Sequence, residues 1–159
     1  MKRYSRDDQI TMALWAAGCA ERVLPLFEAA KPEDDRPHRA IAVCRAWVQT
    51  GVFRMVEIRG ASLGAHAAAR DAEEGSAARF AARAAGQAVA TAHVPQHAYG
   101  AAYYALKAVA AADTAGVARE REWQAGRLPE GLREEIMGRI VVSERKGGVL
   151  VKLRKGEGF

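Results

Sequence analysis

Three of the four histidines stand where imidazole chemistry is conceivable: His66, and the pair His93 and His97 on either side of Pro95. Imidazole is the side chain most used for proton transfer near neutral pH, and it is a common metal ligand. Two histidines four residues apart on one continuous helix share a face, as in metal-binding helices. Because Pro95 lies between them, the sequence does not assure that register. The spacing leaves three alternatives open: a metal site, a catalytic base, or a polar joint between two helices.

Neither a metal site nor a catalytic set is complete around these histidines. A zinc site takes about four ligands, and His66 with Asp71 could add to the pair only by tertiary approach. A catalytic histidine needs a nucleophile or a substrate proton within reach. Thr91 is near in sequence, but it lies in no recognisable nucleophile motif. We therefore expect no catalytic residue, no metal, no cofactor and no enzymatic activity.

The favoured interpretation of these polar residues is structural. They fall within alanine-rich helices, where a buried polar group has to find a hydrogen-bonding partner. Pro95 should leave backbone groups free at a helix junction, and imidazole nitrogens of His93 and His97 could serve them. The candidate polar network, which is also the candidate site, consists of His66, Arg70, Thr91, His93 and His97.

A second candidate site is the charged cluster in "KPEDDRPHRA", made of Asp34, Asp35, Arg36 and Arg39. Arginines in such a loop could bind phosphate groups. Arginines beside acidic residues on a surface more often pair with those acids. We therefore expect ion pairs in this cluster rather than a ligand site.

The elements that position these residues are predicted to be helices. Half of the chain is hydrophobic, and alanine, the strongest helix former, dominates that half. A helix should run from about residue 7 to 24, where Pro25 kinks or ends it and a short turn follows. Residues 52–58 could form a strand by content, although helical spacing favours a helix over about 54–73. The other expected helices lie between Asp35 and Gly51, over 77–91, from Gln96, between Thr114 and Gly126, and from Pro129.

These elements predict an all-α bundle of six or seven helices over residues 1–139, followed by a separate tail over 140–159. The tail has β-branched runs around Gly147 and Gly148, so it is either a short hairpin or a loose end. Residues 139–159 carry six basic and two acidic side chains. Nucleic-acid association through this tail is an alternative function, but a net charge of +5 with interleaved acids indicates it only weakly.

The N-terminal segment and the cysteines indicate the cellular compartment of the protein. A basic start and an apolar run before Cys19 suggest a lipoprotein signal, yet Asp7 and Asp8 precede that run and helical periodicity continues beyond it. Cys19 and Cys44 lie in apolar helical patterns, as buried free thiols do in a reducing compartment. No run reaches the roughly 18 apolar residues of a membrane span. We expect a cytoplasmic protein with no membrane association.

Four segments carry a resemblance to a known family: "LWAAGCAERVLPLFE", "DDRPHRAIAVCRAW", "AHAAARDA" and "ARAAGQAVATAHVPQHAYGAAYYALKA", in this order. Over about residues 13–112 the chain resembles the small helical immunity proteins linked to bacterial toxin systems. The resemblance implies a bacterial protein whose partner is a cognate toxin, neutralised by non-covalent occlusion, with no catalytic residues. The basic net charge argues against a nuclease toxin with a cationic site. A histidine-centred metalloprotein or enzyme stays an alternative, and a homo-oligomer is compatible with the sequence.

Overall fold

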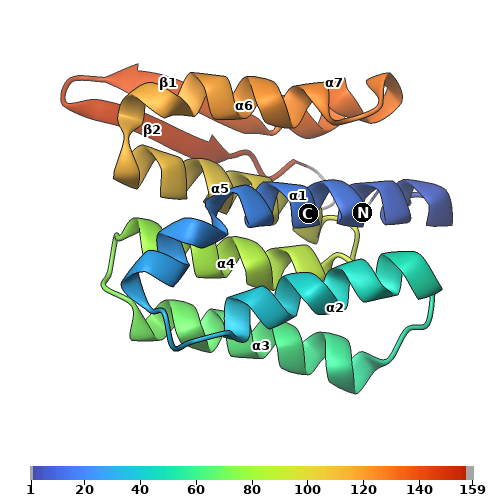
Figure 1. Cartoon of the computed structure of the whole chain (residues 1–159). Helices are drawn as coiled ribbons and strands as arrows, with labels where there is room; N and C mark the ends of the chain where they lie inside the picture. The colour runs from blue at the N-terminus through green and yellow to red at the C-terminus, as the bar shows by residue number, and fades with distance from the viewer. Residues whose placement is uncertain (1, 157–159) are drawn as a thin grey trace.

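The computed structural model describes residues 2–156, and in that range it contains seven α-helices and one β-hairpin (Figure 1). The all-α prediction with a terminal hairpin is confirmed. The elements are α1 (Arg6–Ala30), α2 (Arg36–Thr50), α3 (Met55–Asp71), α4 (Ala77–Ala90), α5 (His97–Ala112), the 3₁₀ turn η1 (Thr114–Gly116), α6 (Val117–Gly126), α7 (Glu130–Gly138), β1 (Ile140–Arg145) and β2 (Gly148–Leu153).

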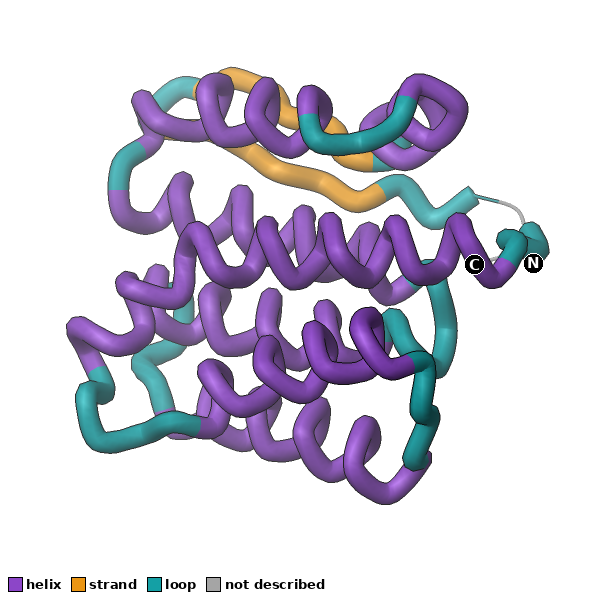
Figure 2. The backbone as a smooth tube through the Cα atoms, turned by 45° about the vertical axis from the view of Figure 1, so that its right-hand side comes forward, coloured by secondary structure: helices purple, strands orange, loops and turns teal. Residues whose placement is uncertain are grey.

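Helix α4 is the centre of the bundle and contacts α1, α2, α3 and α5. The helices stack in layers, with the two strands towards one end of the stack (Figure 2). Its sequence is AARFAARAAGQAVA, and its eight buried residues are all alanine, glycine or valine. Small residues let neighbouring helix backbones approach closely on several sides. The alanine content of the chain therefore serves one helix that is surrounded by the others. Helix α3 contacts only α2 and α4 among the helices with substantial contacts, so it forms an outer layer.

Helix α1 is longer than the sequence predicts. It starts with the expected capping box between Ser5 and Asp8, and it continues through Pro25 to Ala30. The ribbon changes direction in its C-terminal part (Figure 1), as expected where proline removes a helical hydrogen bond. Phe27 is buried there, which keeps the last turns on the core. By length and composition α1 could cross a membrane, although 56% of its most apolar 18-residue segment is buried inside the protein.

Helix α2 begins after Asp35 and ends before Gly51, as predicted. Asp35 holds the N-cap position without a side-chain cap bond, whereas the Asp34 carboxylate accepts from the backbone N–H of Arg36. At the other end, Gly51 takes a left-handed φ of 68°, which a glycine adopts without steric cost. A four-residue extended linker then leads into α3, so residues 52–58 form no strand.

Helix α6 buries part of its charged segment "REREW". Glu120 in this segment is only 8% exposed. The guanidinium group of Arg22 on α1 reaches both carboxylate oxygens of Glu120, at 2.6 and 2.9 Å. The same guanidinium lies 4.2 Å from the centre of a Trp123 ring. A paired charge can be buried where a free one cannot, and periodicity within α6 does not reveal that partner.

The tail is a hairpin that packs against the bundle. Strands β1 and β2 are antiparallel, with Val142 opposite Val151, and the turn uses Gly147 at a φ of 90°. Strand β2 contacts α5. Ile140 and Val151 are buried in the same core cluster as the helices. The hairpin alternative is therefore confirmed over the loose end, while the separation of residues 1–139 from 140–159 stays a prediction.

Both cysteines are buried free thiols, as predicted. Burial raises the pKa of the Cys44 thiol to about 12. Its sulfur lies 3.3 Å from the carbonyl oxygen of Ala88 and 3.6 Å from that of Ala13. A protonated thiol in these surroundings is a small packing group between α2, α1 and α4.

Candidate functional site

The fold brings His66, His93 and His97 to one cavity of about 330 Å³, which we call the histidine cavity. His66 comes from α3, His93 from the turn after α4, and His97 from the first turn of α5. Apolar and polar side chains alternate around it. The lining residues are Met55, Ile58, Arg59, Ser62, Leu63, His66, Ala90, His93 and His97.

His66 lies flat against the backbone of α4. A side chain at Gly86 would place its Cβ only 2.7 Å from Nε2 of His66, so the ring uses the space that the glycine leaves. Its Nδ1 is buried and has no hydrogen-bonding partner. Burial, and next the positive charges of Arg83 and Arg70, lower the pKa of His66 to about 4. The imidazole is therefore neutral at physiological pH and is a poor proton donor to a substrate.

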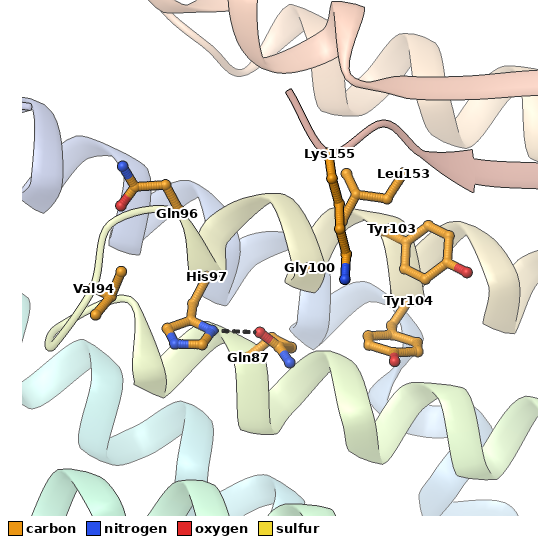
Figure 3. A pocket seen from close by; sticks show the side chains of 9 residues that line it. All are labelled: Gln87, Val94, Gln96, His97, Gly100, Tyr103, Tyr104, Leu153 and Lys155. Carbon is orange, nitrogen blue, oxygen red and sulfur yellow. Dashed lines mark hydrogen bonds between the residues drawn. The ribbon is translucent and has the colours of Figure 1, made fainter. Parts of the chain in front are cut away.

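His97 connects α5 to α4 through a side chain. Its Nδ1 lies 2.8 Å from Oε1 of Gln87 (Figure 3). Because an amide oxygen only accepts, Nδ1 carries the proton and Nε2 is the acceptor. Burial, followed by the charge of nearby His93, lowers the pKa of His97. The prediction that His97 ties the two helices together agrees with this bond, although its partner is a side chain and not a free backbone group.

Contrary to our prediction, the His93 side chain does not serve the free backbone groups at the junction of α4 and α5. Its side chain is exposed and its ring lies over Phe53, with centroids 6.3 Å apart. The free carbonyls after α4 are instead served from α1, because Nε2 of Gln9 donates to the carbonyl oxygens of Thr91 and Ala92, both at 3.0 Å. No local pattern indicates this role for Gln9, which lies more than 80 residues away in the chain.

Thr91 and Arg70 do not line the histidine cavity. Thr91 is fully buried, and its hydroxyl donates to the carbonyl oxygen of Gln87 at 3.2 Å, so it closes the last turn of α4. Arg70 is exposed in the last turn of α3, where a cation favours the helix dipole. The five residues of the candidate network thus divide into three that line the cavity and two that do not.

The charged cluster forms ion pairs, and one of them reaches a third element. Arg36 binds both carboxylate oxygens of Asp34, at 2.9 and 2.6 Å, and Oδ2 of Asp71 at 2.7 Å. Arg39 pairs with Asp35 at 3.0 Å. The hydrogen bond from Arg36 is the main reason why the pKa of Asp34 is lowered. Arg36 therefore fastens the loop before α2 to the end of α3.

The described residues that line the histidine cavity include no carboxylate, cysteine or tyrosine. Across residues 2–156, no group of three or more His, Cys, Asp or Glu side chains is arranged to hold a metal ion. Two of the three imidazoles have lowered pKa values and favour the neutral form.

In a comparison with protein families, the profile of the family described as "Imm-5 like putative immunity protein" matches residues 2–131. The chain belongs to this family. The match includes all five main helices of the bundle and stops before most of α7, so the hairpin lies outside it. Searches of curated proteins and of solved structures gave no match.

An immunity protein needs a surface for its toxin, and one group of residues that sequence reasoning did not select stands out. Six large hydrophobic side chains are exposed in the described part of the chain, and five of them fall within twelve consecutive positions. We call these five the α3 apolar surface. They are Val52, Phe53, Met55, Val56 and Leu63. The signal was present as the apolar run "VFRMV" after Gly51, which we interpreted only as a strand or the start of a helix. Met55 in this run is 44% exposed.

Proposed function

We propose that this member of the immunity family binds a cognate bacterial toxin and neutralises it by non-covalent occlusion. Family membership supplies the general role. The observation that carries the proposal is the concentration of exposed apolar side chains on the α3 apolar surface. Exposed apolar side chains gathered in one place are typical of protein-binding sites.

The α3 apolar surface has the anatomy of an interface centre. Met55, Arg59 and Leu63 recur every fourth residue, so they lie along one face of α3. Met55 and Leu63 also line the histidine cavity, and Phe53 reaches it through its contact with His93. Interfaces concentrate binding energy where an aromatic or aliphatic side chain enters such a pocket. The cavity would accept one projecting apolar side chain of the toxin.

Charges around this surface indicate the chemistry of the toxin. Arg54 and Arg59 are exposed beside it, against one exposed acid, Glu57. No ion pair with a described residue involves any of these three side chains. Complementary charge speeds encounter and excludes wrong partners. The proposed toxin surface is therefore apolar at its centre and acidic at its rim.

We place this neutralisation in the cytoplasm. Free Cys19 and Cys44 support a reducing compartment. The proposal needs no catalytic group.

The test is growth rescue by co-expression with the toxin encoded by a neighbouring gene. Val56→Asp should abolish rescue, because Val56 is 87% exposed and an aspartate in its place would be desolvated on binding. The change should leave folding intact, since an acid in the first turn favours a helix. Copurification of the two proteins should be lost in parallel.

Leu14→Asp is the matched control for this experiment. Leu14 is the sixth exposed large hydrophobic residue, 50% exposed, and it lies on α1. Rescue should persist with this variant. If Val56→Asp rescues growth as well as the unchanged chain does, toxin binding through the α3 apolar surface is wrong. If the unchanged chain rescues growth from none of the neighbouring toxins, the proposed function is wrong.

A further inference from the structure

A second and larger hollow, of about 540 Å³, lies on the other side of His97, between α4, α5 and the segment that follows β2 (Figure 3). Tyr103 and Tyr104 form one end of it, Gln87 and His97 face it from below, and Lys155 reaches into it from above. We call it the tyrosine groove. Its size is within the usual range of small-molecule sites.

Several polar groups that face the tyrosine groove can donate hydrogen bonds, whereas the buried Oε1 of Gln96, which has no partner among the described residues, is an acceptor. Oε1 of Gln87 is occupied by His97, which leaves the two N–H donors of the Gln87 amide group free. The hydroxyl groups of Tyr103 and Tyr104 make no hydrogen bond with a described residue. The ammonium group of Lys155 is likewise in no ion pair within residues 2–156, and Figure 3 shows it suspended above Gly100.

Among the described residues, no acidic side chain lines the tyrosine groove. Further cations stand behind its aromatic wall: Nζ of Lys107 lies 5.4 Å from the centre of the Tyr103 ring, and the Arg83 guanidinium lies 6.0 Å from that of Tyr104. Free donors and several cations without a carboxylate favour a negatively charged ligand.

The aromatic side chains indicate the rest of the ligand. The rings of Tyr103 and Tyr104 meet edge to face, with centroids 4.9 Å apart, and both are half-buried. Val94 and Leu153 add apolar surface to the same groove. Such walls favour a planar apolar body next to the charged group.

We infer that the tyrosine groove binds a small organic anion, in which a carboxylate or a phosphate group is attached to a planar ring. Lys155 and the Gln87 amide would hold the anionic group, and the tyrosine rings would contact the planar part. Gly100 makes this arrangement feasible. A side chain there would place its Cβ 2.8 Å from Oε1 of Gln87, so the glycine lets the amide lie across α5. The site is separate from the α3 apolar surface, and the inference does not depend on the proposed toxin.

Three probes of similar size distinguish the chemistry: phenyl phosphate, phenylacetate and the uncharged benzyl alcohol. Each is titrated into the full-length ¹⁵N-labelled protein and followed by ¹H–¹⁵N NMR. At least one of the two anions should shift the signals of Gly100 and the Gln87 side chain in a saturable manner, with a Kd on the order of 1 mM, as expected for a fragment. Benzyl alcohol should bind at least about tenfold more weakly. Whether phosphate or carboxylate binds more tightly assigns the anionic group.

Two variants test the residues. Lys155→Met should weaken binding of the preferred anion by about tenfold or more, because it removes the charge and keeps the length of the side chain. Lys152→Met is the matched control, since Lys152 is exposed on β2 and does not line the groove, and its affinity should stay within about twofold. Gly100→Ala should also weaken binding, because it displaces the Gln87 amide.

Three results would overturn the inference. The first is the absence of saturable shifts with both anions. The second is equal binding of benzyl alcohol, which would make the groove an apolar site. The third is unchanged affinity in Lys155→Met, which would place the anion elsewhere. Spectra of each variant without probe show directly whether it is folded.

Discussion

At the scale of single residues, His66 best illustrates how burial decides chemistry. Its ring fits against the backbone at Gly86, and its Nδ1 has no partner, so the protein favours the uncharged form. Uncharged and away from any carboxylate, it is suited to packing and to contact with an apolar ligand at the histidine cavity. The same residue type at His93 stays exposed and rests on Phe53. Identical side chains thus have different roles according to what surrounds them.

Replacing His66 with Gln should make the stability of the fold less sensitive to acid. The pKa of His66 is about 4 in the folded chain, against an ordinary value of 6.5. Between these two values the unfolded chain binds more protons, so the free energy of unfolding falls as the pH drops from 6.5 towards 4. The full shift corresponds to about 3 kcal/mol, which partial exposure reduces to about 1–2 kcal/mol.

Urea unfolding at pH 7 and at pH 4.5 measures this difference. His38→Gln is the control, because His38 is exposed on α2 and its replacement should leave the pH dependence unchanged. A remaining slope in His66→Gln is expected from His97, whose pKa is also lowered. Equal acid sensitivity of His66→Gln and the unchanged chain would show that His66 is not held neutral.

At the scale of elements, two glycines let side chains cross between neighbouring helices. The ring of His66 on α3 lies on Gly86 of α4, and the amide of Gln87 on α4 lies on Gly100 of α5. Helix α4 thus accommodates the His66 side chain of α3 and places its own Gln87 side chain on α5. These contacts fix how far each helix slides along its neighbour, which alanine packing alone leaves loosely specified.

Gly86→Ala should destabilise the fold by about 1–2 kcal/mol. Alanine has the better helix propensity, but its Cβ would stand 2.7 Å from Nε2 of His66 and would force the ring out of its position. The matched control is Gly60→Ala in α3, where nothing lies within 4 Å of the added Cβ. That change should stabilise by about 0.5–1 kcal/mol. Chemical denaturation of both variants gives the comparison, and an equal gain in stability would contradict the contact.

The junction between α4 and α5 depends on a residue of α1. Gln9→Ala should cost about 1–2 kcal/mol of unfolding free energy, because the carbonyl groups of Thr91 and Ala92 lose their side-chain donor in a partly buried place. Gln49→Ala, an exposed position on α2, should change stability by less than about 0.5 kcal/mol. Thermal unfolding compares the two, and similar Tm values would mean that water replaces the Gln9 amide without loss.

At the scale of the whole molecule, the two outer sides of the helical bundle, at α5 and at α3, differ in what covers them. The α5 side is covered by the hairpin, whose residues Ile140 and Val151 enter the core. The α3 side is uncovered and carries the α3 apolar surface. The hairpin of the same chain thus covers the apolar residues on the α5 side. The α3 apolar surface stays accessible to the toxin that we propose as partner.

Val151→Asp should lower stability by about 3 kcal/mol or more if the hairpin is part of the cooperative core. Val151 is 5% exposed, so an aspartate in its place would bury a carboxylate without a paired cation. Lys152→Asp, at the next and exposed position on the same strand, is the control and should have a small effect. Circular dichroism at 222 nm follows the helices during unfolding. If Val151→Asp leaves the helical transition unchanged, the hairpin is a separate unit, as the boundary at residue 139 predicts.

Sequence patterns were sufficient for the helices and most of their ends. The Ser5 and Asp8 capping box, the Gly51 stop and the Gly147 turn follow from local geometry that only a few neighbouring residues determine. Burial of Cys19 and Cys44 was likewise predictable, because each lies within an apolar stripe. The resemblance over residues 13–112 also agreed with the family match.

Tertiary structure alone decided which helix face stays open and which partners the polar residues find. Gln9 at the α4 terminus, Arg22 on Glu120 and Arg36 on Asp71 are contacts between residues far apart in sequence, which no local period encodes. Met55 fits an inward helical stripe, yet it is exposed because no element covers that side of α3. Periodicity shows that a helix has an apolar face; only the packed chain determines whether another part of the same molecule buries it.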